Sequence, residues 1–205
     1  MTVETEDERN RAHKTAMQAL KAERDALVAD KVPGQGLLCV YTGDGKGKST
    51  AAFGMVARAL GWGMNVGVVQ FIKGKWVTGE RRFFNRFPEQ LTFRVMGEGF
   101  TWDTQDRARD IAAAEAAWET SLAMIADPSL DLVLLDELNI VLRYGYLGIS
   151  AVVDALKARP RDKHVCITGR DAHPDLIAIA DLVTEMTPVK HPFEQGIKAT
   201  KGVDF

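Results

Sequence analysis

The sequence has 205 residues, of which 46% are apolar and 26% charged, a composition typical of a globular domain with a sizeable core. The formal net charge of -2 argues against nucleic acid as the main partner, and no apolar run reaches the roughly 20 residues that a membrane-spanning helix needs. The polar N-terminus lacks a signal-peptide pattern, and Cys39 and Cys166 lie in strand-like runs without metal-ligand spacing. We therefore expect a protein of the reducing cytoplasm, without a membrane or nucleic-acid partner.

Residues 4–30 have the pattern of one long helix, which the turn signal Pro33-Gly34 ends. Its apolar stripe is thin and consists of Ala12, Ala16, Met17, Leu20 and Leu27. A helix this polar lies outside the core, either as a solvated appendage or as a lid over a site or a partner subunit, and the sequence leaves both open. We place the boundary between a helical extension, residues 1–33, and the main domain, residues 34–205.

The most informative stretch is a glycine-rich loop between the strand-like run 37–40 and the Ala-rich helical pattern 51–60. The loop residues are Thr42, Gly43, Asp44, Gly45, Lys46, Gly47, Lys48, Ser49 and Thr50. In such a unit, backbone N–H groups converge on an anion and the helix dipole favours negative charge. We expect these nine residues to bind a nucleotide phosphate chain, with Lys48 as the main point charge and Ser49 as a hydroxyl ligand of Mg²⁺.

The loop departs from the usual G-x-x-x-x-G-K-[ST] pattern, because Thr42 stands where the first Gly belongs. Three glycines alternate with other residues instead, and Lys46 adds a second cation. An ordinary glycine-rich turn with solvated lysines is the alternative. The order of strand, Gly-Lys-Ser and helix favours phosphate binding over it.

Two further strand-like runs, 65–72 and 91–96, are followed by polar or glycine-rich stretches. Ligands of open α/β sheets bind beyond the carboxyl ends of strands, so the stretch 73–82 is well placed for a substrate. The loop after the second run holds the glycine-flanked aromatics Phe100 and Trp102. These side chains either plug the core or form an apolar wall for a large flat ligand, and the residues alone leave both open.

After a helical pattern at 104–126, the apolar run 131–137 ends in Asp136 and Glu137. In P-loop proteins such a strand is expected beside the phosphate-binding strand, with its terminal acid on the metal; capping of the next helix is the alternative. Two more strand–helix steps follow, and Arg170, after the run 165–168, is expected to bind the nucleotide. This alternation predicts an α/β fold, a three-layer P-loop NTPase-like (RecA-like) domain with a mostly parallel sheet.

With these stretches in place, the chain resembles the P-loop type of corrinoid adenosyltransferase, the ATP:cob(I)alamin or cob(I)yrinic acid a,c-diamide adenosyltransferase family. The resemblance covers about residues 36–205 and rests on motifs in a fixed order. These are Thr42–Thr50, Val69–Gly74, Met96–Trp102, Leu135–Leu138, Thr168–Arg170, Ala180–Met186 and Gly202–Phe205. The loop without its first Gly is this family's own form, and Ser49 stands where many relatives have Thr.

The resemblance implies that ATP binds in reverse along the loop, so that C5′ of its ribose faces a reduced corrinoid. The Co(I) centre attacks C5′ and triphosphate leaves, in the biosynthesis or salvage of adenosylcobalamin. This reaction needs a cradle for a leaving polyanion and Mg²⁺ or Mn²⁺, but no general base.

The resemblance also assigns roles to residues. The aromatic pair would close the lower face of the cobalt and ease its reduction, which favours the ligand wall over the core plug. The implied catalytic residues are Lys48, Glu137, Phe100 and Trp102, and the implied metal ligands are Ser49, Glu137 and Asp136. A flavoprotein reductase and a second copy in a homodimer are the implied protein partners.

Two other classes of function share parts of the pattern. A P-loop small-molecule kinase would share the loop and the carboxylate strand, but we would expect an arginine-rich lid and a base that activates the acceptor. A non-enzymatic, nucleotide-gated regulatory module would have no need for the aromatic pair. Release of triphosphate, of ADP or of no product distinguishes the three.

Overall fold

The computed structural model describes residues 5–32, 34–72, 78–97 and 106–204, and the chain divides into two compact units, Met1–Gly34 and Gln35–Phe205. The first unit contains α1 (Glu6–Ala29). Thr5 and Glu8 form a capping box at its start, in which the Thr5 hydroxyl accepts from the Glu8 N–H and the Glu8 carboxylate accepts from the Thr5 N–H. No described residue of α1 is buried, as its thin apolar stripe predicts.

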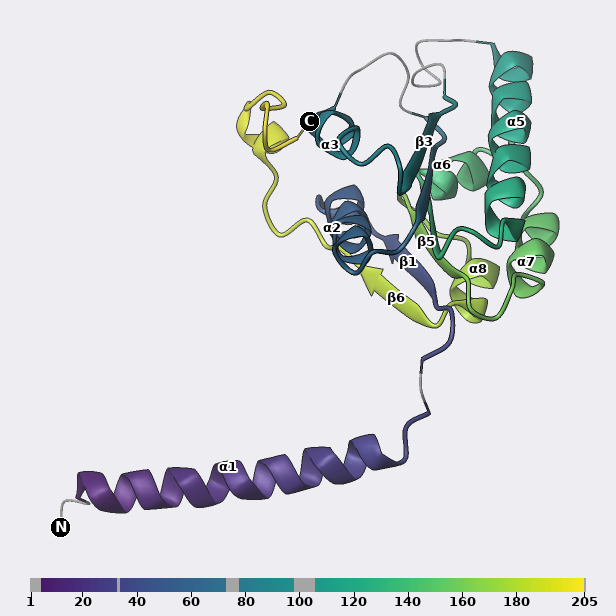
Figure 1. Cartoon of the computed structure of the whole chain (residues 1–205). Helices are drawn as coiled ribbons and strands as arrows, with labels where there is room; N and C mark the ends of the chain where they lie inside the picture. Colours follow the sequence, from purple (N-terminus) through teal and green to yellow (C-terminus); the bar gives the residue numbers. More distant parts are fainter. Residues whose placement is uncertain (1–4, 33, 73–77, 98–105, 205) are drawn as a thin grey trace. The chain divides into compact units, whose positions relative to one another are not determined.

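The second unit is built on a six-stranded sheet in the order β3-β2-β4-β5-β1-β6 (Figure 1). Every neighbouring pair is parallel. The strands are β1 (Leu38–Thr42), β2 (Val66–Gln70), β3 (Leu91–Val95), β4 (Leu132–Asp136), β5 (His164–Thr168) and β6 (Leu182–Glu185). The predicted α/β fold with a parallel sheet is confirmed.

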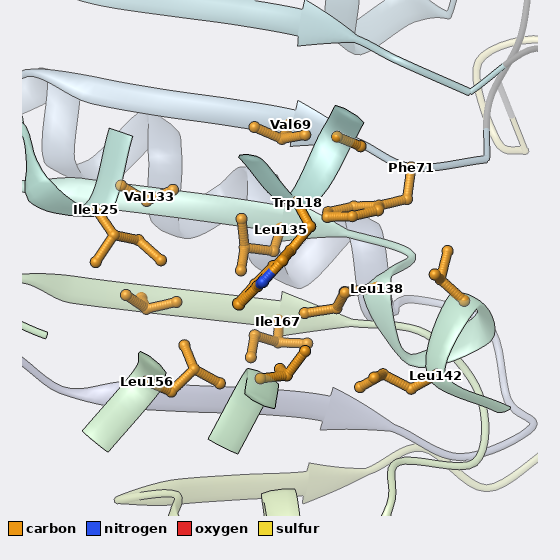
Figure 2. Packing of buried hydrophobic residues seen from close by; sticks show 14 of the residues in the cluster. Val69, Phe71, Trp118, Ile125, Val133, Leu135, Leu138, Leu142, Leu156 and Ile167 are labelled. Atoms are coloured by element: carbon orange, nitrogen blue, oxygen red, sulfur yellow. The ribbon is translucent and has the colours of Figure 1, made fainter. Parts of the chain in front are cut away.

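Helices cover both faces of the sheet. They are α2 (Lys48–Gly61), α3 (Gly79–Phe84), α5 (Arg107–Ala126), α6 (Leu138–Arg143), α7 (Ile149–Lys157) and α8 (Pro174–Ile179), and a 3₁₀ turn, η1 (Pro192–Gln195), follows. Successive strand residues enter opposite layers, because side chains alternate across a strand. Val133 and Leu135 join the hydrophobic cluster under α5–α8, whereas Leu132 and Leu134 join the cluster under α2. Figure 2 shows the first cluster, in which Trp118 from α5 packs among strand residues.

The predicted neighbour of the phosphate-binding strand was wrong. We expected the strand that ends in Asp136 to lie beside β1, but β5 pairs with both β1 and β4 and separates them. The β5 side chains at 165–168 are all buried, and a strand buried on both faces is stabilised by a pairing partner on each edge. The acids of β4 therefore reach the site from one strand further away.

The two cysteines lie in the core. Cys39 and Cys166 are free, buried and opposite one another in the β1–β5 register, and burial raises the pKa of both thiols. Within the described part of the chain, no helix combines the length and the apolarity needed to cross a membrane.

Candidate nucleotide site

A cavity of about 480 Å³ opens where β1 passes into α2. The helices α2, α3 and α6 and the segment that follows β6 all contribute to its wall. Its lining residues are Gly45, Lys46, Gly47, Lys48, Ser49, Thr50, Ile72, Glu80, Glu137, Ile140, Arg143, Tyr144, Arg170, His191, Val203 and Asp204. Six of the nine predicted loop residues are among them, as are Glu137 and Arg170.

Lys48 is the first residue of α2, and its ammonium is folded back into the loop. Its Nζ donates hydrogen bonds to the carbonyl oxygens of Gly43, at 2.7 Å, and of Gly45, at 2.6 Å. Burial lowers the pKa of Lys48, an effect that the carboxylate of Glu137 partly opposes. The cation is therefore fixed in place and poorly hydrated, as a phosphate-binding lysine should be.

The alternating glycines of the loop have a local cause. The loop packs against the backbone that leaves β6, and the Gly45 N–H donates to the Met186 carbonyl over 2.6 Å. A Cβ on Gly43 or Gly45 would lie within 2.7 Å of that carbonyl oxygen, and a Cβ on Gly47 would lie 3.2 Å from the Met186 sulfur. Gly43 and Gly47 also have φ of 90° and 109°, which side chains disfavour. Close packing against Met186 therefore requires glycine at alternate positions.

Thr42 has a structural place in this loop. It is buried, and its hydroxyl accepts a hydrogen bond from the Ala172 N–H over 3.0 Å. This bond ties the end of β1 to the segment after β5. Thr42, Gly43 and Asp44 are not among the residues that line the cavity. Asp44 nevertheless lies near a residue that does, because its Oδ1 is 3.8 Å from Nη1 of Arg170.

The two predicted metal acids, although adjacent, differ in position. Glu137 lines the cavity, whereas Asp136 is fully buried and takes no part in the lining. The Asp136 carboxylate accepts from Gln70 Nε2 over 2.8 Å and from the Thr168 hydroxyl over 2.7 Å. Of the two acids, Glu137 is the one that lines the cavity.

Part of the cavity wall comes from residues to which the sequence assigned no role. His191, Val203 and Asp204 belong to the segment after β6, and Asp204 forms an ion pair with Lys46. The closing Gly-Val-Asp-Phe was noted only as part of the resemblance. Glu80, by contrast, belongs to the predicted substrate stretch 73–82; it enters from α3, with one carboxylate oxygen buried and without a hydrogen-bond partner among the described residues.

Phe100 and Trp102 lie outside the residues that the structure describes, as does the first half, 73–77, of the predicted substrate stretch 73–82. Among the described residues, no group of three His, Cys, Asp or Glu side chains is arranged to hold a metal. Ser49 and Glu137 are among the residues of the cavity wall whose side chains carry oxygen atoms.

Comparison with known proteins identifies the chemistry. Residues 34–205 match the family model described as ATP:corrinoid adenosyltransferase BtuR/CobO/CobP. The chain is 57% identical to a corrinoid adenosyltransferase of Pseudomonas aeruginosa, over 97% of this chain and 98% of that one. It is 52% identical to one from Sinorhizobium sp, over 94% and 91%, and 50% identical to one from Salmonella typhimurium, over 92% and 95%.

These matches extend over almost the whole chain and agree with the phosphate loop, the buried lysine and the carboxylate strand. They support adenosyl transfer to a corrinoid, and they give no support to the kinase or to the non-enzymatic module. The chain belongs to the ATP:corrinoid adenosyltransferase family, and it is an enzyme.

Proposed function

We propose that the chain binds ATP with its triphosphate along residues 42–50 and transfers the 5′-deoxyadenosyl group to the Co(I) centre of a reduced corrinoid. Cobalt attacks C5′ of the ribose, the C5′–O bond breaks, and triphosphate leaves with the bonding electrons. The observation that best supports this is the position of Lys48, which lines the cavity and whose ammonium is held by the Gly43 and Gly45 carbonyls.

The cavity is suited to a leaving polyanion. Lys46, Lys48 and Arg170 bring positive charge to one end of it, and the start of α2 adds its dipole. Positive charge held in place before the reaction stabilises a leaving triphosphate more than it stabilises bound ATP, because negative charge builds up on the leaving oxygen.

A divalent cation fits the remaining donors. The Ser49 hydroxyl and the Glu137 carboxylate are oxygen ligands on the cavity wall, and Mg²⁺ in nucleotide sites takes one or two protein oxygens and completes its shell with phosphate and water. When bound, Mg²⁺ or Mn²⁺ neutralises charge on the triphosphate. Ser49 and Glu137 would hold it, and Asp136 stays behind them.

Five further features belong to the proposal and rest on the sequence and on its resemblance to the family. A flavoprotein reductase supplies the electron that produces Co(I), two copies of the chain form a homodimer, and the enzyme works in the cytoplasm. Phe100 and Trp102 close the lower face of cobalt while it is reduced. The helical extension, residues 1–33, acts as a lid or as a dimer element.

Product analysis tests the transfer. ATP, Mg²⁺ and chemically reduced cob(I)alamin are incubated with the enzyme, and the phosphate products are separated while the Co–C bond is followed by its absorbance. We expect one triphosphate per alkylated cobalt, and a loss of both products in Lys48→Ala. Formation of ADP, or of alkylated cobalt without triphosphate, would overturn the proposal.

A further inference from the structure

Glu137 has an unusual backbone conformation. Among the described residues, only Glu137 and Asp171 are non-glycine residues with positive φ, and Glu137 has φ 67° and ψ 20°. This left-handed conformation is unfavourable for a residue with a side chain, so it persists only where the surroundings enforce it. It falls between the last residue of β4 and the first of α6. The sharp turn there leaves the Glu137 side chain on the cavity wall and that of Asp136 in the core.

A hydroxyl from the neighbouring strand holds this turn. The Thr168 Oγ1, at the end of β5, accepts a hydrogen bond from the Glu137 N–H over 2.9 Å and donates one to Asp136 Oδ1 over 2.7 Å. A hydroxyl has one proton, so donation to the carboxylate leaves its lone pairs for the amide. Asp136 Oδ1, as the acceptor, thus fixes the direction in which the Thr168 hydroxyl points.

A third strand completes the arrangement. Gln70 is the register partner of Asp136 in β2, and its Nε2 donates to the second carboxylate oxygen, Asp136 Oδ2, over 2.8 Å. All three side chains are at most 2% exposed. Hydrogen bonds in such a dry setting are stronger than at the surface, and a satisfied network there holds a single geometry.

We infer that Thr168 and Asp136 are positioning residues that act through the backbone of Glu137, and that Asp136 is not itself a metal ligand. Gln70 orients Asp136, Asp136 orients the Thr168 hydroxyl, and this hydroxyl holds the Glu137 amide in the left-handed turn that directs its carboxylate to the cavity. The inference rests on the proposed function, in which Glu137 holds the divalent cation. A purely structural role, in which Thr168 only satisfies a buried acid, is the competing explanation.

The test compares Thr168→Val, which keeps the shape and loses the hydroxyl, with Thr168→Ser, which keeps the hydroxyl. The first measurement needs neither metal nor nucleotide, namely the exchange rate of the Glu137 amide followed by NMR. We expect exchange about 10-fold faster in Thr168→Val, the consequence of losing one buried hydrogen bond, and near wild-type exchange in Thr168→Ser. The matched control is Thr184→Val at the exposed end of β6, which should leave this amide unchanged.

The second measurement is Mn²⁺ binding to the enzyme–ATP complex, followed by electron paramagnetic resonance. Loss of an outer partner of a metal ligand typically weakens metal affinity about 10- to 100-fold, and we expect a loss in this range for Thr168→Val, with recovery in Thr168→Ser. Adding Thr168→Val to Glu137→Gln should cause no further loss, because the hydroxyl acts through Glu137. Gln70→Met, further from the turn, should weaken Mn²⁺ binding less but in the same direction, and it serves as the second variant if Thr168→Val does not fold.

The outcomes separate the inference from the function on which it rests. If Glu137→Gln weakens Mn²⁺ binding and neither Thr168→Val nor Gln70→Met does, the positioning role is wrong and the metal role of Glu137 stands. If Glu137→Gln leaves Mn²⁺ binding unchanged, the proposed metal role itself is wrong. Additive losses in the double variant would show that Thr168 acts by a route other than Glu137.

Discussion

The ammonium of Lys46, in the phosphate loop, forms an ion pair with the carboxylate of Asp204, in the segment that follows β6. Asp204 is also tied to its own turn, because its Oδ2 accepts from the Thr200 N–H over 2.7 Å and its N–H donates to the Thr200 carbonyl over 2.8 Å. The Lys46 side chain is 48% exposed and the Asp204 side chain only 10%. The ion pair therefore holds the segment that follows β6 against the loop on which the triphosphate is proposed to lie.

The first prediction concerns this fastening. In Asp204→Asn, we expect amides of residues 196–204 to exchange faster at pH 7 than in the wild type, because the charge-assisted bond to Lys46 is lost. Hydrogen exchange with mass spectrometry measures this, and Glu194→Gln, an exposed carboxylate of the same segment, is the control. Equal protection in Asp204→Asn and the wild type would show that the ion pair does not hold the segment.

The same pair predicts a pH dependence. The bond from Lys46 lowers the pKa of Asp204 below its ordinary 3.8. A carboxyl group with a lowered pKa in the native state stabilises that state above its ordinary pKa, and this contribution is lost as the pH falls through the native pKa. The wild type should therefore exchange the amides of residues 196–204 more slowly than Asp204→Asn down to about pH 3.8, and this difference should disappear only below that pH.

The second prediction concerns Lys48. Lys48→Ala should lower turnover by about 10²-fold or more and weaken ATP binding, because it removes the fixed cation beside the loop amides. Calorimetric titration with ATP and a triphosphate assay measure the two effects, with Lys157→Ala on the exposed side of α7 as the control. Burial lowers the pKa of Lys48, so this ammonium loses its proton at a lower pH than an ordinary lysine. As the pH rises, ATP affinity should therefore begin to fall below pH 10.5, the ordinary pKa of lysine. Near-normal turnover in Lys48→Ala would remove the loop lysine from the mechanism.

The third prediction compares two glycines. A Cβ on Gly45 would lie 2.7 Å from the Met186 carbonyl oxygen, whereas a Cβ on Gly54, within α2, has no atom within 4 Å. Gly45→Ala should therefore lower the free energy of unfolding by about 1–3 kcal/mol. Gly54→Ala should raise it by about 0.5–1 kcal/mol, because alanine is the better helix former. Urea unfolding measures both changes. An unchanged free energy of unfolding in Gly45→Ala would mean that the backbone at Met186 moves away from the new Cβ at little cost.

Much of this architecture could be predicted because the strands are short apolar runs buried on both faces, and glycine-rich or acidic residues mark the ends of β1 and β4. The six-residue helices α3 and α6 were missed, since one and a half turns show too little periodicity. The insertion of β5 between β1 and β4 is a property of the whole sheet, which no local pattern encodes. The cavity wall at His191 and Asp204 was missed for the same reason.

The neighbouring acids show this limit most clearly. Asp136 and Glu137 are adjacent in the sequence, and both were predicted to bind the metal, with Glu137 favoured only by its place in the family motif. A left-handed backbone at Glu137 separates them into a buried and an accessible carboxylate. That conformation is held by Thr168 from another strand, so it follows from tertiary contacts and not from the residues around it.

The fourth prediction concerns the helical extension. Removing residues 1–33 should raise the corrinoid KM while leaving ATP affinity largely intact, because the described lining of the nucleotide cavity comes entirely from the second unit. Steady-state kinetics with each substrate varied in turn measures this. Equal losses for both substrates would indicate a folding role for the extension.

The last prediction concerns Phe100 and Trp102, which the resemblance assigns to the reduction of cobalt and not to alkyl transfer. A five-coordinate Co(II) corrinoid is hard to reduce, because its axial ligand raises the energy of the orbital that accepts the electron. Aromatic rings that fill the place of the lower ligand exclude water, the next available ligand. Shrinking either ring to Ala should let water or the nucleotide base coordinate again. Turnover with a flavoprotein reductant should then fall by about 10-fold or more, the effect expected when an apolar shell that controls solvent access to a metal is opened.

Transfer from chemically reduced Co(I) provides the control within the same variants. Co(I) needs no axial ligand, and the residues proposed to bind the triphosphate are unchanged, so Phe100→Ala and Trp102→Ala should keep most of their rate with a strong chemical reductant. The ratio of the two rates in each variant, compared with the wild type, isolates the reduction step from binding and folding. Equal loss with both reductants would mean that the aromatic pair holds the corrinoid or the fold, and its role in reduction would have to be abandoned.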